Sequence, residues 1–176
     1  MTQPHITLSS LKKYLKTCSQ EQLVNEISEL FRRFPTVKQY YQIKLYPESE
    51  EQVISKYKKA IENEFLPSRG FDNAMHKSAK KAISEYKKIS QTPLGLVDIM
   101  LFYVEQGVKF IKSCGDIDEN FYISMEGMYE KAVTFISNHG FKDIFQERCQ
   151  KIVEDTSDIG WGFHDALSEI YEESFL

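Results

Sequence analysis

The chain contains few of the residues that build loops and cross-links, with 8 glycines, 5 prolines and 3 cysteines among 176 residues. So little glycine and proline excludes a low-complexity chain and disfavours a turn-rich β-sandwich. Cys18, Cys114 and Cys149 are widely separated and form neither a CxxC pair nor the Cys/His spacing of a zinc site. They predict neither a disulfide framework nor structural zinc, and they favour a reducing, cytoplasmic environment.

Long apolar runs are also missing from the sequence. The longest, Ile99 to Val104, has six residues, whereas a membrane-spanning helix needs about 18 or more. The segment from Met1 to Leu15 contains neither the apolar stretch nor the small-residue cleavage site of a secretory signal peptide. We therefore expect no membrane association and no secretion.

Neither sign of charge dominates, because 22 basic and 26 acidic residues give a formal net charge of -4. This balance argues against a dedicated nucleic-acid-binding protein. The two halves differ, since residues 1–90 hold 16 basic and 10 acidic residues and residues 91–176 hold 6 and 16. The difference predicts either one basic and one acidic face, or two surfaces whose charges attract each other within the folded chain.

The spacing of apolar residues indicates helices almost throughout. They recur at intervals of three and four, and no stretch alternates for long enough to predict a half-buried strand. We predict an all-α fold of eight or nine helices in a single domain over residues 1–176. Short connections favour antiparallel neighbours, which means a compact multi-helix bundle or a short stack of antiparallel helical hairpins. Residues 93–113 are apolar around most of the helix circumference and predict its central helix.

Capping patterns indicate where several helices begin. Residues 19–22 form a Ser-x-x-Gln capping box, residues 49–52 repeat the pattern, and Ser9 or Ser10 lies at the start of the first helix. The helix that follows Ser19 has a continuous apolar face, which we expect to be buried. Its residues are Leu23, Ile27, Leu30, Phe31 and Phe34.

A lysine-rich helix face is the first candidate for a binding site. Four lysines lie opposite the apolar stripe of the helix predicted to end near Ile89, and three more lie on the preceding helix. They are Lys77, Lys80, Lys81 and Lys88, with Lys56, Lys58 and Lys59 on the preceding helix. Such a surface would neutralise phosphates. The other interpretation is a solubilising face, because lysine lacks the bidentate fork of arginine.

The second candidate is the segment around the single tryptophan. Trp161 stands between two glycines, and His164 and Asp165 follow it. Glycine permits positive φ or close backbone approach, and an indole on such a loop would anchor a partner. Alternatively, Trp161 plugs the end of the bundle. A metal site is disfavoured, because the residues three and four positions from His164 are not usual ligands.

No pattern typical of an active site is found in the sequence. Cys149 follows Arg148, and a neighbouring cation lowers the pKa of a thiol, but Cys149 shares an apolar stripe with Phe145 and Ile152. This spacing favours a core cysteine. A glycine-rich phosphate loop and a GxSxG elbow are absent. We predict no catalytic residue, no metal and no cofactor.

Three sets of segments resemble a bacterial family of short helical proteins known only as a domain of unknown function. They are residues 11–15, 19–23 and 37–41, residues 100–105 and 115–119, and residues 152–156 and 160–165. The resemblance extends over most of the chain. It implies an all-helical, cytoplasmic bacterial protein and supplies no activity, cofactor or catalytic residue.

The sequence therefore favours a non-enzymatic helical module that binds another protein or acts as an adaptor, with Trp161, His164 and Asp165 as binding candidates. The alternative is a nucleic-acid-associated protein that uses the lysine face. An enzyme centred on the same Trp-His-Asp segment has the least support. The identity of the protein partner and the oligomeric state stay open.

Overall fold

The computed structural model describes residues 5–66 and 73–176, with the side chains of residues 73–76 left aside. The described residues form nine α-helices and one short 3₁₀ helix, and no strand lies among them. The helices are α1 (Leu8–Leu15), α2 (Gln20–Arg33), α3 (Pro35–Leu45), α4 (Glu50–Glu64), α5 (Asn73–Ile89), α6 (Pro93–Cys114), α7 (Glu119–His139), α8 (Lys142–Glu154) and α9 (Phe163–Phe175), with the 3₁₀ helix η1 at Pro47–Ser49. The prediction of an all-α fold with eight or nine helices is confirmed.

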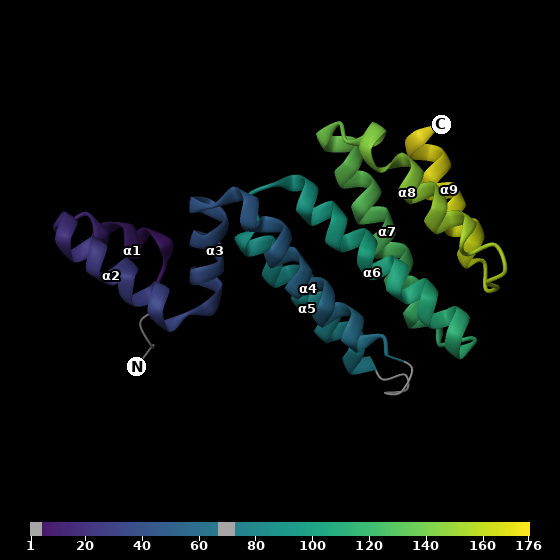
Figure 1. Cartoon of the computed structure of the whole chain (residues 1–176), viewed down its shortest axis with the longest axis horizontal. Helices are drawn as coiled ribbons and strands as arrows, with labels where there is room; N and C mark the ends of the chain where they lie inside the picture. The colour runs from purple at the N-terminus through teal and green to yellow at the C-terminus, as the bar shows by residue number, and fades with distance from the viewer. Residues whose placement is uncertain (1–4, 67–72) are drawn as a thin grey trace.

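The helices are arranged as a row of hairpins with one pair set apart from the rest (Figure 1). We call α1 and α2, residues 8–33, the arm, and α4 to α9, residues 50–175, the body. In Figure 1 the arm projects at one end of the molecule, and α3 joins it to the body. Within the body, α4 packs on α5, α6 on α7, and α9 on both α7 and α8.

The predicted central helix is confirmed. α6 contacts α4, α5, α7 and α8, and more than half of its 22 residues are buried. Val97, Leu101 and Val104 are fully enclosed in this core. Burying one such side chain stabilises the fold by about 1.5–3 kcal/mol, so most of the stability comes from the body.

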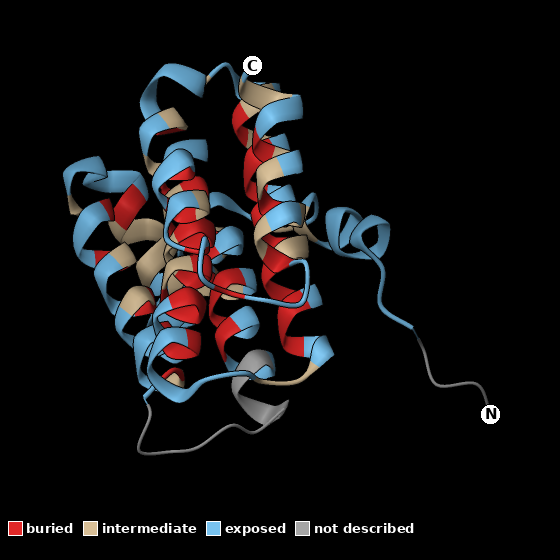
Figure 2. Ribbon diagram, turned by 90° about the vertical axis from the view of Figure 1, so that its right-hand side faces the viewer, coloured by how far each residue is buried: buried red, intermediate tan, exposed pale blue. Residues whose placement is uncertain are grey.

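The arm is not part of this core, and the expectation that α2 buries its apolar face is wrong. Neither α1 nor α2 contains a buried residue, and Ile27, Leu30, Phe31 and Phe34 are 38–48% exposed. Figure 2 shows the contrast, since the buried positions gather on the body helices. Periodicity predicts which face of a helix is apolar, but it does not reveal what covers that face.

The capping predictions have mixed outcomes. At α2, the Ser19 hydroxyl accepts from the Gln22 N–H and the Gln22 side chain accepts from the Ser19 N–H, as expected. At α1, the cap is Thr7, with Ser10 as its partner in the capping box. At α4, Ser49 already has helical dihedral angles and makes no cap, because Pro47 starts a 3₁₀ turn ahead of it.

Candidate functional site

An open groove of about 940 Å³ lies between α5 and α7. Its floor is apolar and is contributed mainly by the buried faces of α5, α6 and α7. The floor residues are Ile83, Leu96, Met100 and Met128, with Phe135 at one side. Lys80 and Lys87 border it from α5, and Lys131 borders it from α7.

The groove follows from residue spacing on its two walls. On α5, Lys80, Ser84 and Lys87 are spaced by four and three residues, which places all three on one side of the helix. On α7, Gly127 lines the groove without a side chain. The space that its Cβ atom would occupy is open, with no atom within 4 Å. The result is an apolar groove with lysine ammonium groups at both rims and no side chain at Gly127 on the α7 side.

Three lysines and one acid, Glu130, line the groove, so its balance of charge favours an anionic ligand. Burial lowers the pKa of Lys80, and the positive charge of Lys131 lowers it further. Within the described residues, Lys80 makes no ion pair. A carboxylate bound between Lys80 and Lys131 would offset both effects and raise the pKa of Lys80 again.

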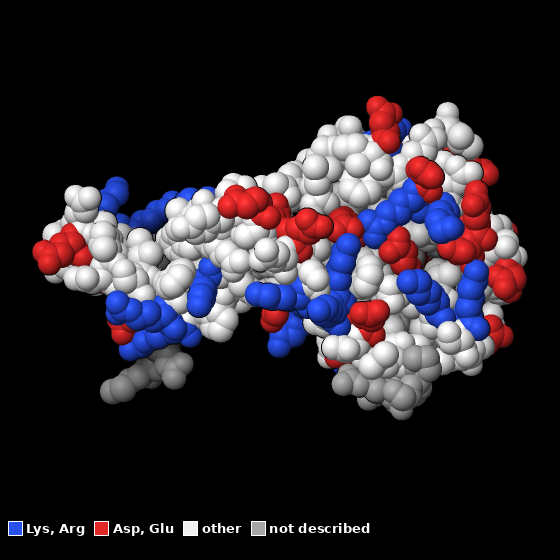
Figure 3. All heavy atoms as spheres, viewed as in Figure 1, with Lys and Arg blue, Asp and Glu red and all other residues white. Residues whose placement is uncertain are grey.

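The four lysines predicted as a basic face are all exposed, but they do not form one site. Lys80 lines the groove, whereas Lys77, Lys81 and Lys88 do not. Lys81 lies 3.9 Å from Glu85 one turn further along α5. On the face viewed in Figure 3, basic and acidic side chains are interleaved over the body rather than separated by sign.

The Trp161 side chain is 71% exposed, so the interpretation that it plugs the bundle is wrong. Its backbone is left-handed, with φ of 62°, and Gly162 follows with φ of 71°. A non-glycine residue in this region costs about 1–2 kcal/mol. The loop between α8 and α9 thus combines a strained backbone with an exposed indole at Trp161.

His164 and Asp165 do not join Trp161 in a common site. The Thr156 hydroxyl donates to the Val153 carbonyl at 2.6 Å, so the Nδ1–H of His164 donates to that hydroxyl at 3.0 Å. This arrangement ties the start of α9 to the end of α8. Asp165 is exposed in the first turn of α9, where a carboxylate suits the helix dipole. Among the described contacts, no hydrogen bond or ion pair connects the three side chains.

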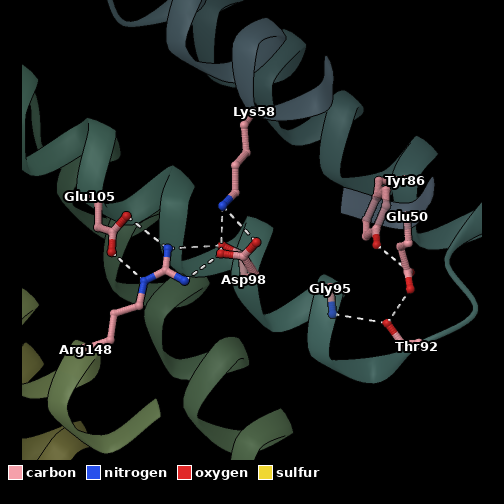
Figure 4. Close-up of polar contacts among 8 residues, drawn as sticks. All are labelled: Glu50, Lys58, Tyr86, Thr92, Gly95, Asp98, Glu105 and Arg148. Atoms are coloured by element: carbon pink, nitrogen blue, oxygen red, sulfur yellow. Dashed lines mark hydrogen bonds and ion pairs between the residues drawn. The ribbon is translucent and has the colours of Figure 1, made fainter. Parts of the chain in front are cut away.

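Sequence reasoning missed an ion cluster that joins three body helices (Figure 4). The Arg148 guanidinium of α8 donates to Glu105 at 2.6 and 3.0 Å and to the Asp98 carboxylate of α6 at 2.6 Å. Lys58 of α4 donates to the same Asp98 carboxylate at 2.8 Å. Burial alone would lower the pKa of Arg148, but Glu105 and Asp98 outweigh that effect and raise it.

A pattern that points to this cluster is present in the sequence. Asp98 and Glu105 are two acids seven residues apart on one side of an otherwise apolar helix, which calls for cations on neighbouring helices. The cluster cross-links α4, α6 and α8. It also removes Lys58 from the basic surface that had been predicted on the preceding helix.

A second polar cluster lies at the start of α4 and α6 (Figure 4). The buried Glu50 carboxylate accepts hydrogen bonds from Tyr86 and Thr92, each at 2.8 Å, and from Ser90 at 3.3 Å. A Cβ atom at Gly95 would lie 2.2 Å from the Tyr86 hydroxyl. Because Gly95 has no Cβ atom, the Tyr86 hydroxyl has room to donate its hydrogen bond to the Glu50 carboxylate.

Cys149 is fully buried, as the sequence predicted. Burial raises the pKa of its thiol to about 12, and the nearby Arg148 lowers it by less than burial raises it. A thiolate nucleophile is therefore not available at neutral pH. The described residues also contain no group of three or more His, Cys, Asp or Glu side chains that could hold a metal ion.

A family model described as a family of unknown function, DUF6155, matches residues 6–175. The chain belongs to this family. The expected resemblance to a family of unknown function is thereby confirmed over nearly the whole chain. No curated protein and no solved structure matches it. In the part of the DUF6155 chain that the structure describes, no helix has the length and apolar character needed to cross a membrane.

Proposed function

We propose that this protein is a non-enzymatic interaction module that binds an acidic amphipathic helix of a partner protein in the groove between α5 and α7. The observation that carries the proposal is the combination of an apolar floor with lysines on both walls. An amphipathic helix buries its apolar face in such a groove and presents its flanking side chains to the rims. Acidic flanks would meet Lys80, Lys87 and Lys131.

The dimensions of the groove support a helical ligand. It runs along α7 from Asn120 to Asn138, a stretch of about 27 Å at 1.5 Å per residue. Gly127 lies in that stretch and allows a partner backbone to approach closely. The exposed Ile123 adds an apolar contact beside it.

An apolar floor is less suited to nucleic acid, the alternative function. Phosphate binding needs cations on a continuous surface, and two of the lysines outside the groove are paired with acids, Lys81 with Glu85 and Lys58 with Asp98. Base stacking needs exposed aromatic platforms, whereas Phe135 is the single aromatic residue among those lining the groove.

The test is selection of ligands from a displayed library of short helical peptides, panned against the full chain. We expect enriched peptides to carry an apolar stripe at i, i+3, i+4 and i+7 flanked by Asp or Glu. Gly127→Glu should weaken their binding about tenfold or more, because it puts a carboxylate into the groove. The substitution replaces a partly exposed helical glycine with a better helix former, so the fold should hold.

Two triple variants on the same chain separate the alternatives. Lys80→Glu/Lys87→Glu/Lys131→Glu should abolish peptide binding, and the matched control Lys77→Glu/Lys81→Glu/Lys88→Glu should leave it unchanged. Enrichment of basic peptides, or equal binding by Gly127→Glu, would contradict the proposal. Binding of labelled DNA duplex that is lost in the control triple would favour the nucleic-acid alternative instead.

We place the action of this module in the cytoplasm. The support is that Cys18, Cys114 and Cys149 are all free thiols, as in proteins of reducing compartments. Fractionation of the source cell tests this assignment, with recovery in the soluble reduced fraction as the expected result and recovery outside the cytoplasm as the contradicting one.

A further inference from the structure

The arm carries an apolar stripe that the described residues cover only in part. Leu23, Ile27 and Leu30 of α2 and Phe34, the residue after its end, are spaced by four, three and four residues, and Phe31 lies beside them. Ile27, Leu30 and Phe34 are 44–48% exposed although the same chain encloses equivalent residues of the body almost completely. Isolated helices of this length are marginal in water, so the stripe needs a partner.

The stripe continues into a hollow at the junction with α3. A groove of about 400 Å³ is lined by Ile27, Phe31, Tyr41 and Leu45 among others. The Phe31 and Tyr41 rings pack edge to face with centroids 6.4 Å apart. The partner therefore meets both a helix stripe and a pocket that accepts an apolar side chain.

Charge along α2 points to what the partner is. Glu21 and Glu26 lie in the first half of the helix, and Arg32 and Arg33 end it. In Figure 3 acidic side chains lie at the free tip of the arm, and a basic group lies where the arm meets α3. Glu29, in the second half, pairs with Arg33 of the same helix. An antiparallel neighbour with the same distribution places the acidic start of each α2 opposite the basic end of the other.

We propose that the arm is covered by the arm of a second copy of this chain, with the two α2 helices packed antiparallel about a two-fold axis between Ser28 and Glu29. In this register Ile27 faces Leu30 of the other copy, and Val24 faces Phe31. Glu26 of each copy faces Arg33 of the other, giving two equivalent ion pairs at the edges of the apolar seam.

The single-copy contacts of these two charged residues are compatible with the pairing. Arg33 lies 2.6 Å from Glu29 of its own helix and is 68% exposed, and a guanidinium has enough donors for a second carboxylate. Glu26 accepts a hydrogen bond from Tyr14 of α1, and its other oxygen stays available. The arm surface is separate from the α5–α7 groove, so this inference does not depend on the proposed function.

Sedimentation equilibrium of the full chain over a range of concentrations tests the proposal. The wild-type chain is expected to reach twice its monomer mass. Ile27→Asp should abolish the dimer, because in each copy it buries a carboxylate against the apolar Leu30 of the other copy. Since Ile27 is exposed in the single copy, the helical circular dichroism of the body should be unchanged.

Charge reversal tests orientation and register. Glu26→Arg and Arg33→Glu should each weaken dimerisation about tenfold, because each turns two attractions into repulsions. The double variant Glu26→Arg/Arg33→Glu should recover wild-type dimerisation, as should a mixture of the two single variants. Glu21→Arg changes charge at a position off the seam and outside the groove and serves as the matched control that leaves the dimer intact.

Each of three results would overturn the inference. The first is a wild-type chain that stays monomeric at every concentration. This result overturns the inference even if the arm binds a different protein. The second is a dimer that tolerates Ile27→Asp. The third is a double variant that fails to recover, which would exclude the antiparallel register.

Discussion

The helices of the arm are capped but bury no residue, whereas the body helices bury apolar residues whether they are capped, as α6 and α7 are, or not. Both helices of the arm have complete capping boxes, at Thr7 and at Ser19, and neither buries a residue. Helices α4, α8 and α9 of the body have no side-chain cap, yet each buries apolar residues against its neighbours. A cap contributes about 1 kcal/mol, whereas burial contributes more with every residue enclosed. Local capping therefore fixes where an arm helix begins, and packing decides whether a body helix is stable.

The largest difference is expected between the reactivity of the buried Cys149 in the body and that of Cys18, since Cys114, also in the body, is exposed and should react readily. Cys149 in the body is fully buried with its pKa raised to about 12, whereas Cys18 at the end of α1 is partly exposed. At pH 8 the Cys149 thiolate fraction is on the order of 10⁻⁴, so alkylation should wait for the body to unfold. Mass spectrometry after timed iodoacetamide treatment should show Cys18 labelled many times faster. Equal rates would mean that the body opens as easily as the arm.

A matched pair of leucine truncations measures the two regions in free energy. Leu101→Ala removes a fully buried side chain of α6 and should lower the free energy of unfolding by about 2–5 kcal/mol. Leu30→Ala removes a 46% exposed side chain of α2 and should change it by less than about 0.5 kcal/mol in dilute, monomeric protein. Urea denaturation followed by circular dichroism gives both values. A comparable loss from Leu30→Ala would place the arm inside the cooperative core.

The same comparison applies to ion pairs. Arg148→Ala leaves Asp98 and Glu105 without their shared cation in a setting only about one quarter exposed, and it should cost about 1–3 kcal/mol. Arg33→Ala removes an equally short contact with Glu29 from a largely exposed site, and it should cost less than about 0.5 kcal/mol. Thermal denaturation of both variants checks the ratio. Similar losses would show that distance, rather than burial, sets the value of these pairs.

The smallest effect concerns two glycines of the body. Gly95→Ala forces the Tyr86 hydroxyl away from the buried Glu50 carboxylate and should destabilise the fold by about 1–2 kcal/mol. Gly127→Ala meets no neighbouring atom and should stabilise α7 by about 0.5–1 kcal/mol. The two changes in melting temperature should have opposite signs. A stable Gly95→Ala variant would mean that Tyr86 is free to move.

The fold class was predictable because helical periodicity and the capping box at Ser19 are local properties of the sequence. The exposure of the arm was not, since the stripe that contains Leu30 has the spacing of a buried face and the sequence does not reveal what packs on it. The groove could not be predicted, because it forms between α5 and α7 and the sequence does not show that these helices are neighbours. Gly127, which leaves its α7 side open, has no recognisable role without that knowledge.

Local sequence likewise could not settle the Trp161 segment. Two glycines permit either direction for the side chain, and the sequence reveals neither the left-handed backbone of Trp161 nor the exposure of its indole. The inward orientation of His164 depends on Thr156, eight residues earlier. Asp98 similarly pairs with both Lys58 and Arg148, which are far from it in the sequence. The spacing of acids on α6 indicates that cations are needed, but it does not identify them.

Hydrogen exchange of backbone amides, followed by mass spectrometry at low and high protein concentration, tests most directly whether the arm depends on a second copy. The account predicts that α6 and α7 are protected equally at both concentrations, while protection of α2 rises with concentration and is lost in Ile27→Asp. Full protection of α2 in dilute protein, or none at any concentration, would contradict it.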